Sequence, residues 1–282
     1  MTSINDLSCK PNEPAKALAI YREHGAVLVR EVVSPDRVSA FVSAIVLLLK
    51  CRLEQANGSN LDELFSKLVA IDPRRGGELL MAARDTPAFF DVIFAPALRE
   101  LVSVVSRQEL LQTVPEMCQL RIDGPGQQDR LFEWHYDAAY TAMADSAVTC
   151  WLPMTAISHD MGPLKIIPGS HREVWKVRFR RDLAGQSFAG PKRIEMANPD
   201  IENFERRSIE VTPMQPGDTL LFHGRLLHCS GDNQSARYRW ICNPRFGDLT
   251  DPKLVKQGWT VSRSRNPFAF GDYHPEQVAS DS

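Results

Sequence analysis

Apolar residues in the first 110 positions recur mostly with the spacing of amphipathic helices. Ser34 can cap a helix that opens with Pro35, and Asn60 can cap the next one. Between helical runs, Gly25–Arg30 is short, apolar and rich in valine, which predicts an early strand. The helices expected from these patterns span 35–55, 61–71, 77–84 and 96–107.

After residue 114 the apolar runs shorten to strand length and are separated by Gly, Pro, Asp and Asn. Several short strands with turn signals between them predict a sandwich, a barrel or a jelly roll. No alternation of strands with helices follows, so a parallel α/β sheet is not expected. The predicted strands span 116–123, 131–137, 147–154, 163–168, 207–212, 218–223 and 236–243.

These patterns predict a mainly β fold with flanking helices, organised as one domain over residues 1–282. Residues 1–110 should form a helical buttress, residues 111–246 a β core, and residues 247–282 a tail that wraps the surface. A chain of this length can bury a sizeable core without dividing into two domains.

Composition narrows the class of protein. The chain is 43% hydrophobic and 24% charged with a formal net charge of −2, which favours neither nucleic acid nor an anionic membrane as partner. The start lacks the pattern of a signal peptide, and the apolar run Ala44–Leu49 is far too short to span a bilayer. The six cysteines form no C-x-x-C pair, which indicates reduced thiols and a cytoplasmic location.

Candidate metal ligands stand in the predicted strand 131–137. Side chains on a strand alternate between its faces, so His135 and Asp137 should project together while Tyr136 points away. An imidazole and a carboxylate on one face supply two ligands of a 2-His-1-carboxylate metal site. A solvated pair on an exposed strand remains the simpler alternative at this point.

Two later segments offer the remaining groups, each with an alternative. His223 and His228 lie near the end of an apolar strand, and either can supply the third ligand or be a core histidine. Arg237 and Arg239 share a predicted face, where a buried guanidinium would need an anionic partner such as a dicarboxylate. The alternative is that either arginine faces solvent.

At these residues the chain resembles the phytanoyl-CoA dioxygenase family of Fe(II)/2-oxoglutarate oxygenases, whose core is a double-stranded β-helix, or jelly roll. The resemblance covers Trp134–Asp137, the Gly162–His171 segment that ends in Pro-Gly-Ser-His, and the segment from His228 to Arg239. It is specific from about residue 115 to 246. It is looser over Tyr21–Val33, which is similar to the family's usual opening.

The resemblance implies that His135, Asp137 and His228 hold Fe(II), and it favours His228 over His223 because a serine follows two residues on. It further implies contacts to 2-oxoglutarate by three residues and a weaker contact to substrate by a fourth. Halogenating relatives replace the carboxylate ligand, so the aspartate present here favours hydroxylation. The residues implied to bind 2-oxoglutarate are Arg239, Ser230 and Trp151, and the implied substrate residue is Gln119.

The function expected from this resemblance is oxidation of a small-molecule metabolite with O2 and 2-oxoglutarate, releasing succinate and CO2. Asp123 departs from relatives that carry asparagine there, which puts that contact in question. Tyr136 and Cys229, beside the ligands, should only pack. Alternatives are a cupin-like divalent-metal protein and a catalytically silent binding module. The stretch 171–193 is basic, yet 194–210 is acidic and nearly cancels it, so a solvated loop is favoured over an anion site.

Overall fold

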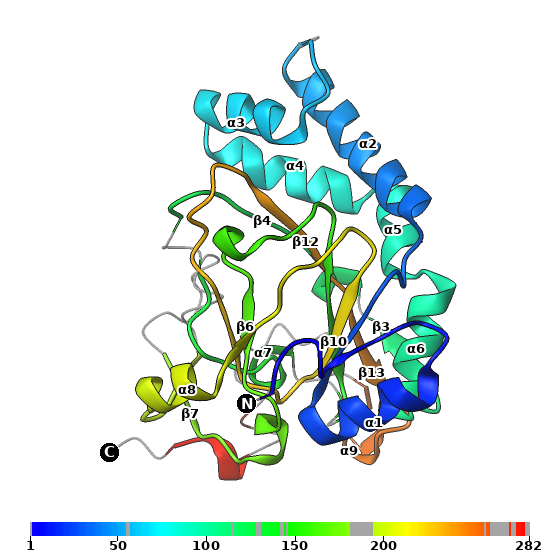
Figure 1. The fold of residues 1–282 in the computed structure, drawn as a ribbon, viewed down its shortest axis with the longest axis vertical. Coiled ribbons are helices and arrows are strands. Elements are labelled where there is room, and N and C mark those ends of the chain that lie inside the picture. The colour runs from blue at the N-terminus through cyan, green and yellow to red at the C-terminus, as the bar shows by residue number, and fades with distance from the viewer. Residues whose placement is uncertain are drawn as a thin grey trace.

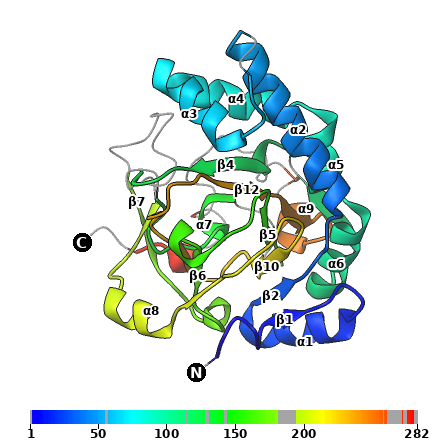
Figure 2. The same cartoon turned by 45° about the horizontal axis from the view of Figure 1, so that its top comes forward.

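The helices of the N-terminal third lie together on one side of the computed structural model (Figures 1 and 2). Asn60 caps its helix as expected, accepting a hydrogen bond from the Glu63 backbone N–H at 3.0 Å. The structure describes residues 2–54, 57–113, 115–127, 131–141, 144, 146–180, 194–256, 258–259, 271 and 275–279. The helices before residue 110 are α1 (Pro14–His24), α2 (Pro35–Arg52), α3 (Leu61–Ile71), α4 (Arg74–Arg84), α5 (Pro87–Ile93) and α6 (Pro96–Ser106).

Four of these helices, α2, α3, α4 and α6, confirm the predicted positions within a few residues. The patterns missed α1, which buries only Ala17, Ile20 and Tyr21, and α5, which is seven residues long. α5 is too short for a clear apolar periodicity, and α1, although eleven residues long, buries too few residues to form a clear apolar face. Within the described ranges, no helix is both long and apolar enough to cross a bilayer.

A large sheet forms the wall between the helices and the interior. Its strands run in the order β1-β2-β10-β5-β12-β4, with β13 joining β3 to β5, and every pairing except that of β1 with β2 is antiparallel. The predicted early strand is confirmed as β2. The strands are β1 (Ser8–Cys9), β2 (Ala26–Val29), β3 (Leu111–Thr113), β4 (Gln119–Asp123), β5 (Val148–Pro153), β10 (Thr219–His223), β12 (Arg239–Asn243) and β13 (Arg245–Asp248).

A smaller sheet, in the order β11-β6-β9, supplies the second layer. Together the two sheets make a mainly β fold with flanking helices, as the sequence predicts. The strands β7 and β8 pair antiparallel as a separate two-stranded sheet. The remaining elements are β6 (Leu164–Ile166), β7 (Val177–Phe179), β8 (Ile194–Met196), β9 (Ile209–Glu210), β11 (His228–Ser230), α7 (Ala138–Thr141), α8 (Ile201–Arg207) and α9 (Pro252–Lys256).

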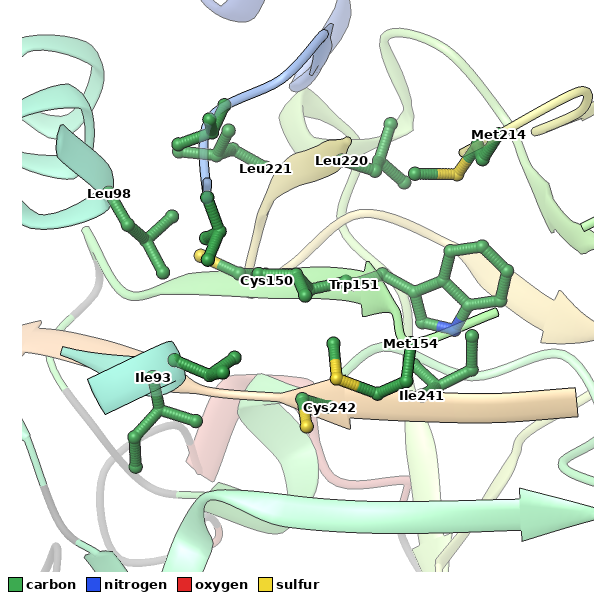
Figure 3. Close-up of a cluster of buried hydrophobic side chains, with 14 of the residues drawn as sticks. Ile93, Leu98, Cys150, Trp151, Met154, Met214, Leu220, Leu221, Ile241 and Cys242 are labelled. Atoms are coloured by element: carbon green, nitrogen blue, oxygen red, sulfur yellow. The ribbon is translucent and has the colours of Figure 1, made fainter. Parts of the chain in front are cut away.

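Strict alternation on the large sheet separates the core from the interior cavity. Cys150 on β5 and Cys242 on β12 are fully buried on the helix side, near Leu98 and Leu221 (Figure 3). Trp240 packs edge-on against Phe65 of α3 with 5.2 Å between ring centroids. The residues between these positions face the other way and line the cavity described below.

Several strand predictions are wrong in extent. β4 begins at Gln119 rather than at 116, because Pro115–Met117 form a short 3-10 helix, and β9 covers only Ile209–Glu210 of the predicted 207–212. Residues 131–137 form no strand; only His135 makes an isolated bridge, to His228. The strand predicted from 236 begins at Arg239, because the chain bends over residues 235–237. Of the predicted C-terminal wrap, β13, α9 and residues 275–279 are described, and the rest lies largely outside the described residues. Most of the basic stretch, from 181 to 193, also lies outside them.

Candidate active site

A cavity lies between the two sheets, and its walls come from both. The large sheet contributes inward-facing residues of β4, β5, β10 and β12, and the small sheet contributes β6 and β11. The pleat explains this arrangement, because every second residue of each strand points inward. The lining includes Gln119, Arg121, Asp123, Phe132, His135, Asp137, Thr149, Trp151, Phe222, His228, Ser230, Arg239, Asn243 and Arg245.

Three potential metal ligands converge in this cavity. Asp137 Oδ1 lies 3.8 Å from Nε2 of His135 and 3.8 Å from Nε2 of His228. In the part of the chain that the structure describes, this is the one group of His, Cys, Asp or Glu whose donor atoms meet, all within 4.8 Å of one another. Two imidazoles and one carboxylate form the donor set of non-haem iron sites, so the residues fit Fe(II).

Backbone contacts orient both imidazoles before any metal binds. Nδ1 of His135 lies 2.7 Å from the Glu133 carbonyl oxygen, and Nδ1 of His228 lies 2.8 Å from the Leu226 carbonyl oxygen. When each Nδ1–H donates to its carbonyl, the lone pair of Nε2 is left for a metal. The two histidines also exchange backbone hydrogen bonds of 3.0 and 2.9 Å, which fixes their spacing.

Two side chains donate hydrogen bonds to the oxygen of Asp137 that points away from the histidines. Thr149 Oγ1 donates to Asp137 Oδ2 at 2.6 Å, and Arg245 Nε donates to the same oxygen at 3.2 Å. Burial alone would raise the pKa of Asp137, but Arg245 and the two imidazoles outweigh it and bring the pKa below its ordinary value. Asp137 is therefore ionised, with Oδ1 directed toward the histidines.

Burial keeps both histidines neutral, the state in which they bind metals. It lowers the pKa of His135 to about 3, with His228 adding to the shift, and it lowers the pKa of His228 as well. Metal-free protein therefore binds fewer protons than the unfolded chain between about pH 6.5 and pH 3.

The free energy of unfolding of metal-free protein should consequently fall as pH is lowered through that window, by up to about 1.4 kcal/mol per pH unit for each group. Urea unfolding between pH 4.5 and 6.5 measures the slope. His135→Gln, which removes the buried titrating ring, should reduce that slope. An equal slope in wild type and His135→Gln would contradict the assignment of a buried neutral imidazole.

Arg239 lies at the end of the cavity where β4 pairs with β12. It is 2% exposed, and its Nη2 donates to Asp123 Oδ2 at 3.0 Å. Nη1 donates to the carbonyl oxygens of Met161 and Gly231 at 3.2 and 3.4 Å, while Nε has no partner among the described residues. A buried guanidinium with unused N–H donors suits an additional oxygen ligand.

The other predicted cosubstrate residues also line the cavity. Ser230 follows His228 on β11, and its Oγ accepts a hydrogen bond from the Phe132 backbone N–H at 3.3 Å. Trp151 faces the cavity and is also 95% buried in the main core, so it belongs both to the core and to the cavity wall. Gln119 lines the cavity from the exposed start of β4.

The structure separates the alternatives that the sequence leaves open. His223 packs near His171 and Tyr21, with ring centroids 5.4 and 6.4 Å away, and does not line the cavity. The Arg237 side chain is 55% exposed and lies 3.7 Å from Asp62 on the surface.

The two residues beside the ligands pack as predicted. Tyr136 and Cys229 are buried with Trp134 and Phe204 in a second hydrophobic cluster, away from the cavity. They stand on the face opposite to His135 and His228 respectively, as alternation requires.

Sequence reasoning missed Thr149 and Arg245. Thr149 stands two residues before Trp151 on the same face of β5, so the period of two was a usable signal. Arg245 follows Pro244 after the end of β12, and no local pattern links it to Asp137, more than one hundred residues earlier.

Paired histidines and a carboxylate in a jelly-roll cavity that ends in a buried arginine define a class: non-haem Fe(II)- and 2-oxoglutarate-dependent oxygenases. Within it, the phytanoyl-CoA dioxygenase (PhyH) family matches residues 21–241. The chain belongs to this family.

Among curated relatives, 1-deoxypentalenic acid 11-beta-hydroxylase from Streptomyces exfoliatus is 29% identical over 118 residues, 40% of this chain and 38% of the relative. Ectoine dioxygenase from Halomonas elongata is 30% identical over 162 residues, 51% of this chain and 48% of the relative. The alignments thus span less than half of these two relatives.

A solved structure shares the fold: the epimerase SnoN in complex with Fe3+, alpha ketoglutarate and nogalamycin RO. It has a TM-score of 0.58 at 17% sequence identity, with 85% of each chain covered. At this identity the likeness supports the jelly-roll architecture alone.

Proposed function

We propose that this protein uses Fe(II), 2-oxoglutarate and O2 to oxidise a small organic molecule, with release of succinate and CO2. The carrying observation is one cavity that holds both the His135–Asp137–His228 group and, at its end, the buried Arg239. A metal site alone would suit many reactions; the added arginine suits a dicarboxylate cosubstrate.

Each group has a distinct part in this proposal. The two histidines and Asp137 would hold the iron, and the iron with its cosubstrate supplies the oxidising chemistry when bound. Arg239 would bind the distal carboxylate with help from Ser230, and Trp151 would flank the cosubstrate. Two aromatic rings would keep water from the ligands. The Phe132 ring lies 4.9 Å from the His135 ring, and the Phe222 ring lies 4.7 Å from the His228 ring.

Anaerobic addition of Fe(II) and then 2-oxoglutarate tests the proposal. An oxygenase of this class shows a visible metal-to-ligand charge-transfer band when the cosubstrate chelates the iron. A cupin-like metal protein or a silent binding module has no need of this chelate, so the absence of the band would favour one of those alternatives.

The histidine assignment gives a paired prediction. His228→Ala should lose iron and the charge-transfer band, because it removes one of three ligands. His223→Ala is the matched control, with the same substitution five residues earlier on a ring outside the cavity, and it should retain both. Metal analysis after desalting measures the difference. Iron loss by His223→Ala with retention by His228→Ala would reverse the assignment.

The proposed substrate is a small molecule. Hydroxylation is the favoured reaction, because halogenating relatives replace the carboxylate ligand and this chain keeps Asp137 in that position. The curated relatives are named for acting on 1-deoxypentalenic acid and ectoine, which supports a low-molecular-weight substrate. A succinate-release screen across candidate metabolites identifies the substrate.

The six cysteines are free thiols, which supports the cytoplasm as the location of the protein.

A further inference from the structure

Three charged side chains meet at the Arg239 end of the cavity. Arg239 and Asp123 are direct cross-strand partners on β12 and β4. Arg121 stands two residues before Asp123 on the same face of β4, and its Nη2 donates to Asp123 Oδ1 at 2.8 Å. Since Oδ2 accepts from Arg239, each carboxylate oxygen of Asp123 holds a different guanidinium.

These contacts decide which edge of Arg239 a ligand can use. Its Nη1 is occupied by two carbonyl oxygens, and its Nη2 is bound by Asp123. Among the described residues, the buried Nε has no partner, and buried N–H groups are rarely left so in native proteins. Asp123 therefore orients the guanidinium and leaves the Nε donor, together with the second N–H of Nη2, for oxygens of the cosubstrate.

The same carboxylate would weaken anion binding if it stood alone. Asp123 beside Arg239 cancels the positive charge that should attract a dicarboxylate. Arg121 offsets that cancellation, so the three groups together keep one positive charge. Burial alone would raise the pKa of Asp123, but Arg121 and Arg239 outweigh it and hold the pKa below its ordinary value. The carboxylate is thus ionised, and its charge has to be balanced.

We propose that Asp123 is a positioning residue that orients Arg239 for 2-oxoglutarate, and that Arg121 is the charge partner that makes this carboxylate compatible with an anionic cosubstrate. The proposal deepens the proposed function and rests on it. It assigns paired roles to two residues of β4 whose side chains are joined to each other and to Arg239 through the Asp123 carboxylate.

A double-mutant cycle tests the proposal. The dissociation constant of 2-oxoglutarate is measured from the charge-transfer band of anaerobic Fe(II) protein. Arg121→Gln should weaken binding roughly tenfold, because the site then has no net charge. Asp123→Asn keeps an oxygen that can accept from Arg239 Nη2, so it removes the negative charge without removing the orienting contact, and it should tighten binding roughly threefold. The double variant restores a single positive charge, and because the two charge effects oppose each other it should bind only about threefold more weakly than wild type. Arg121→Lys keeps the charge and should bind nearly as wild type does.

The direction in which each single variant changes the dissociation constant of 2-oxoglutarate distinguishes this role from a purely structural one. If the pair only maintained packing, both single variants would weaken binding and the double variant would recover nothing; that result overturns the proposal. Thermal unfolding of each metal-free variant establishes that it is folded. If wild-type protein itself gives no band, the proposed function fails first. A band in wild type together with unchanged binding in both single variants removes only the roles of Asp123 and Arg121.

Discussion

Asp137→Ala should abolish iron retention and the charge-transfer band, the largest effect expected of any single substitution in the cavity. The carboxylate is the sole anionic ligand of the group, and its loss removes both a donor and the charge that balances the metal. The substitution also leaves Arg245 without its carboxylate partner, so the free energy of unfolding should fall by about 3 kcal/mol. Metal analysis and urea unfolding measure the two effects.

Asp36→Ala provides the control, since it removes an exposed carboxylate in the first turn of α2. It should leave the iron content unchanged and lower the free energy of unfolding by no more than about 1 kcal/mol. Asp137→Asn separates the two effects, because the amide keeps an oxygen for Arg245 and Thr149 while it removes the charge. Near-wild-type iron content in Asp137→Ala would show that the His-Asp-His group is not the metal site.

Arg239→Ala should raise the apparent dissociation constant of 2-oxoglutarate by about two to three orders of magnitude. Charge-assisted hydrogen bonds to a buried anion contribute about 1.5–3 kcal/mol each, and truncating one partner costs about 3–5 kcal/mol. At about 1.4 kcal/mol per decade, this gives the expected change. Iron should still bind, because Arg239 is not among the converging metal donors.

Arg237→Ala is the matched control, with the same substitution two residues away on an exposed side chain. Its contact with Asp62 lies at the surface, so the constant should change by less than about tenfold. Titration of both variants with 2-oxoglutarate under anaerobic Fe(II) decides between them. A large loss in Arg237→Ala and none in Arg239→Ala would place the cosubstrate elsewhere.

Local patterns predicted those parts of the molecule that depend on periodicity. The helices α2, α3 and α6 carry caps or prolines at their starts and long apolar faces, and β5 and β10 are apolar runs bounded by turns. The choice of His228 and Arg239 came from the family resemblance, since alternation alone placed Arg237 on the same face. The structure brings both preferred residues to the cavity.

Long-range contacts were beyond such patterns. The segment around His135 has the composition of a strand, yet it makes only one bridge, and that bridge forms with a residue 93 positions later. Arg245 is equally remote from Asp137, so nothing nearby in sequence identifies it as a partner. The start of β12 was misplaced because residues 235–237 are held in a bend by hydrogen bonds to Asn233 and Ser235.

The reciprocal backbone hydrogen bonds between His135 and His228 have a thermodynamic consequence for metal uptake. A metal that must gather ligands from a loose chain loses part of its binding energy to the conformational entropy of ordering them. Here that entropy is lost during folding, when the ladder between the two segments forms. The preorganised donors leave nearly the whole coordination energy for affinity. We therefore expect metal-free protein to stay folded and to exchange iron without unfolding, in contrast to small zinc domains, which unfold when the ion is removed.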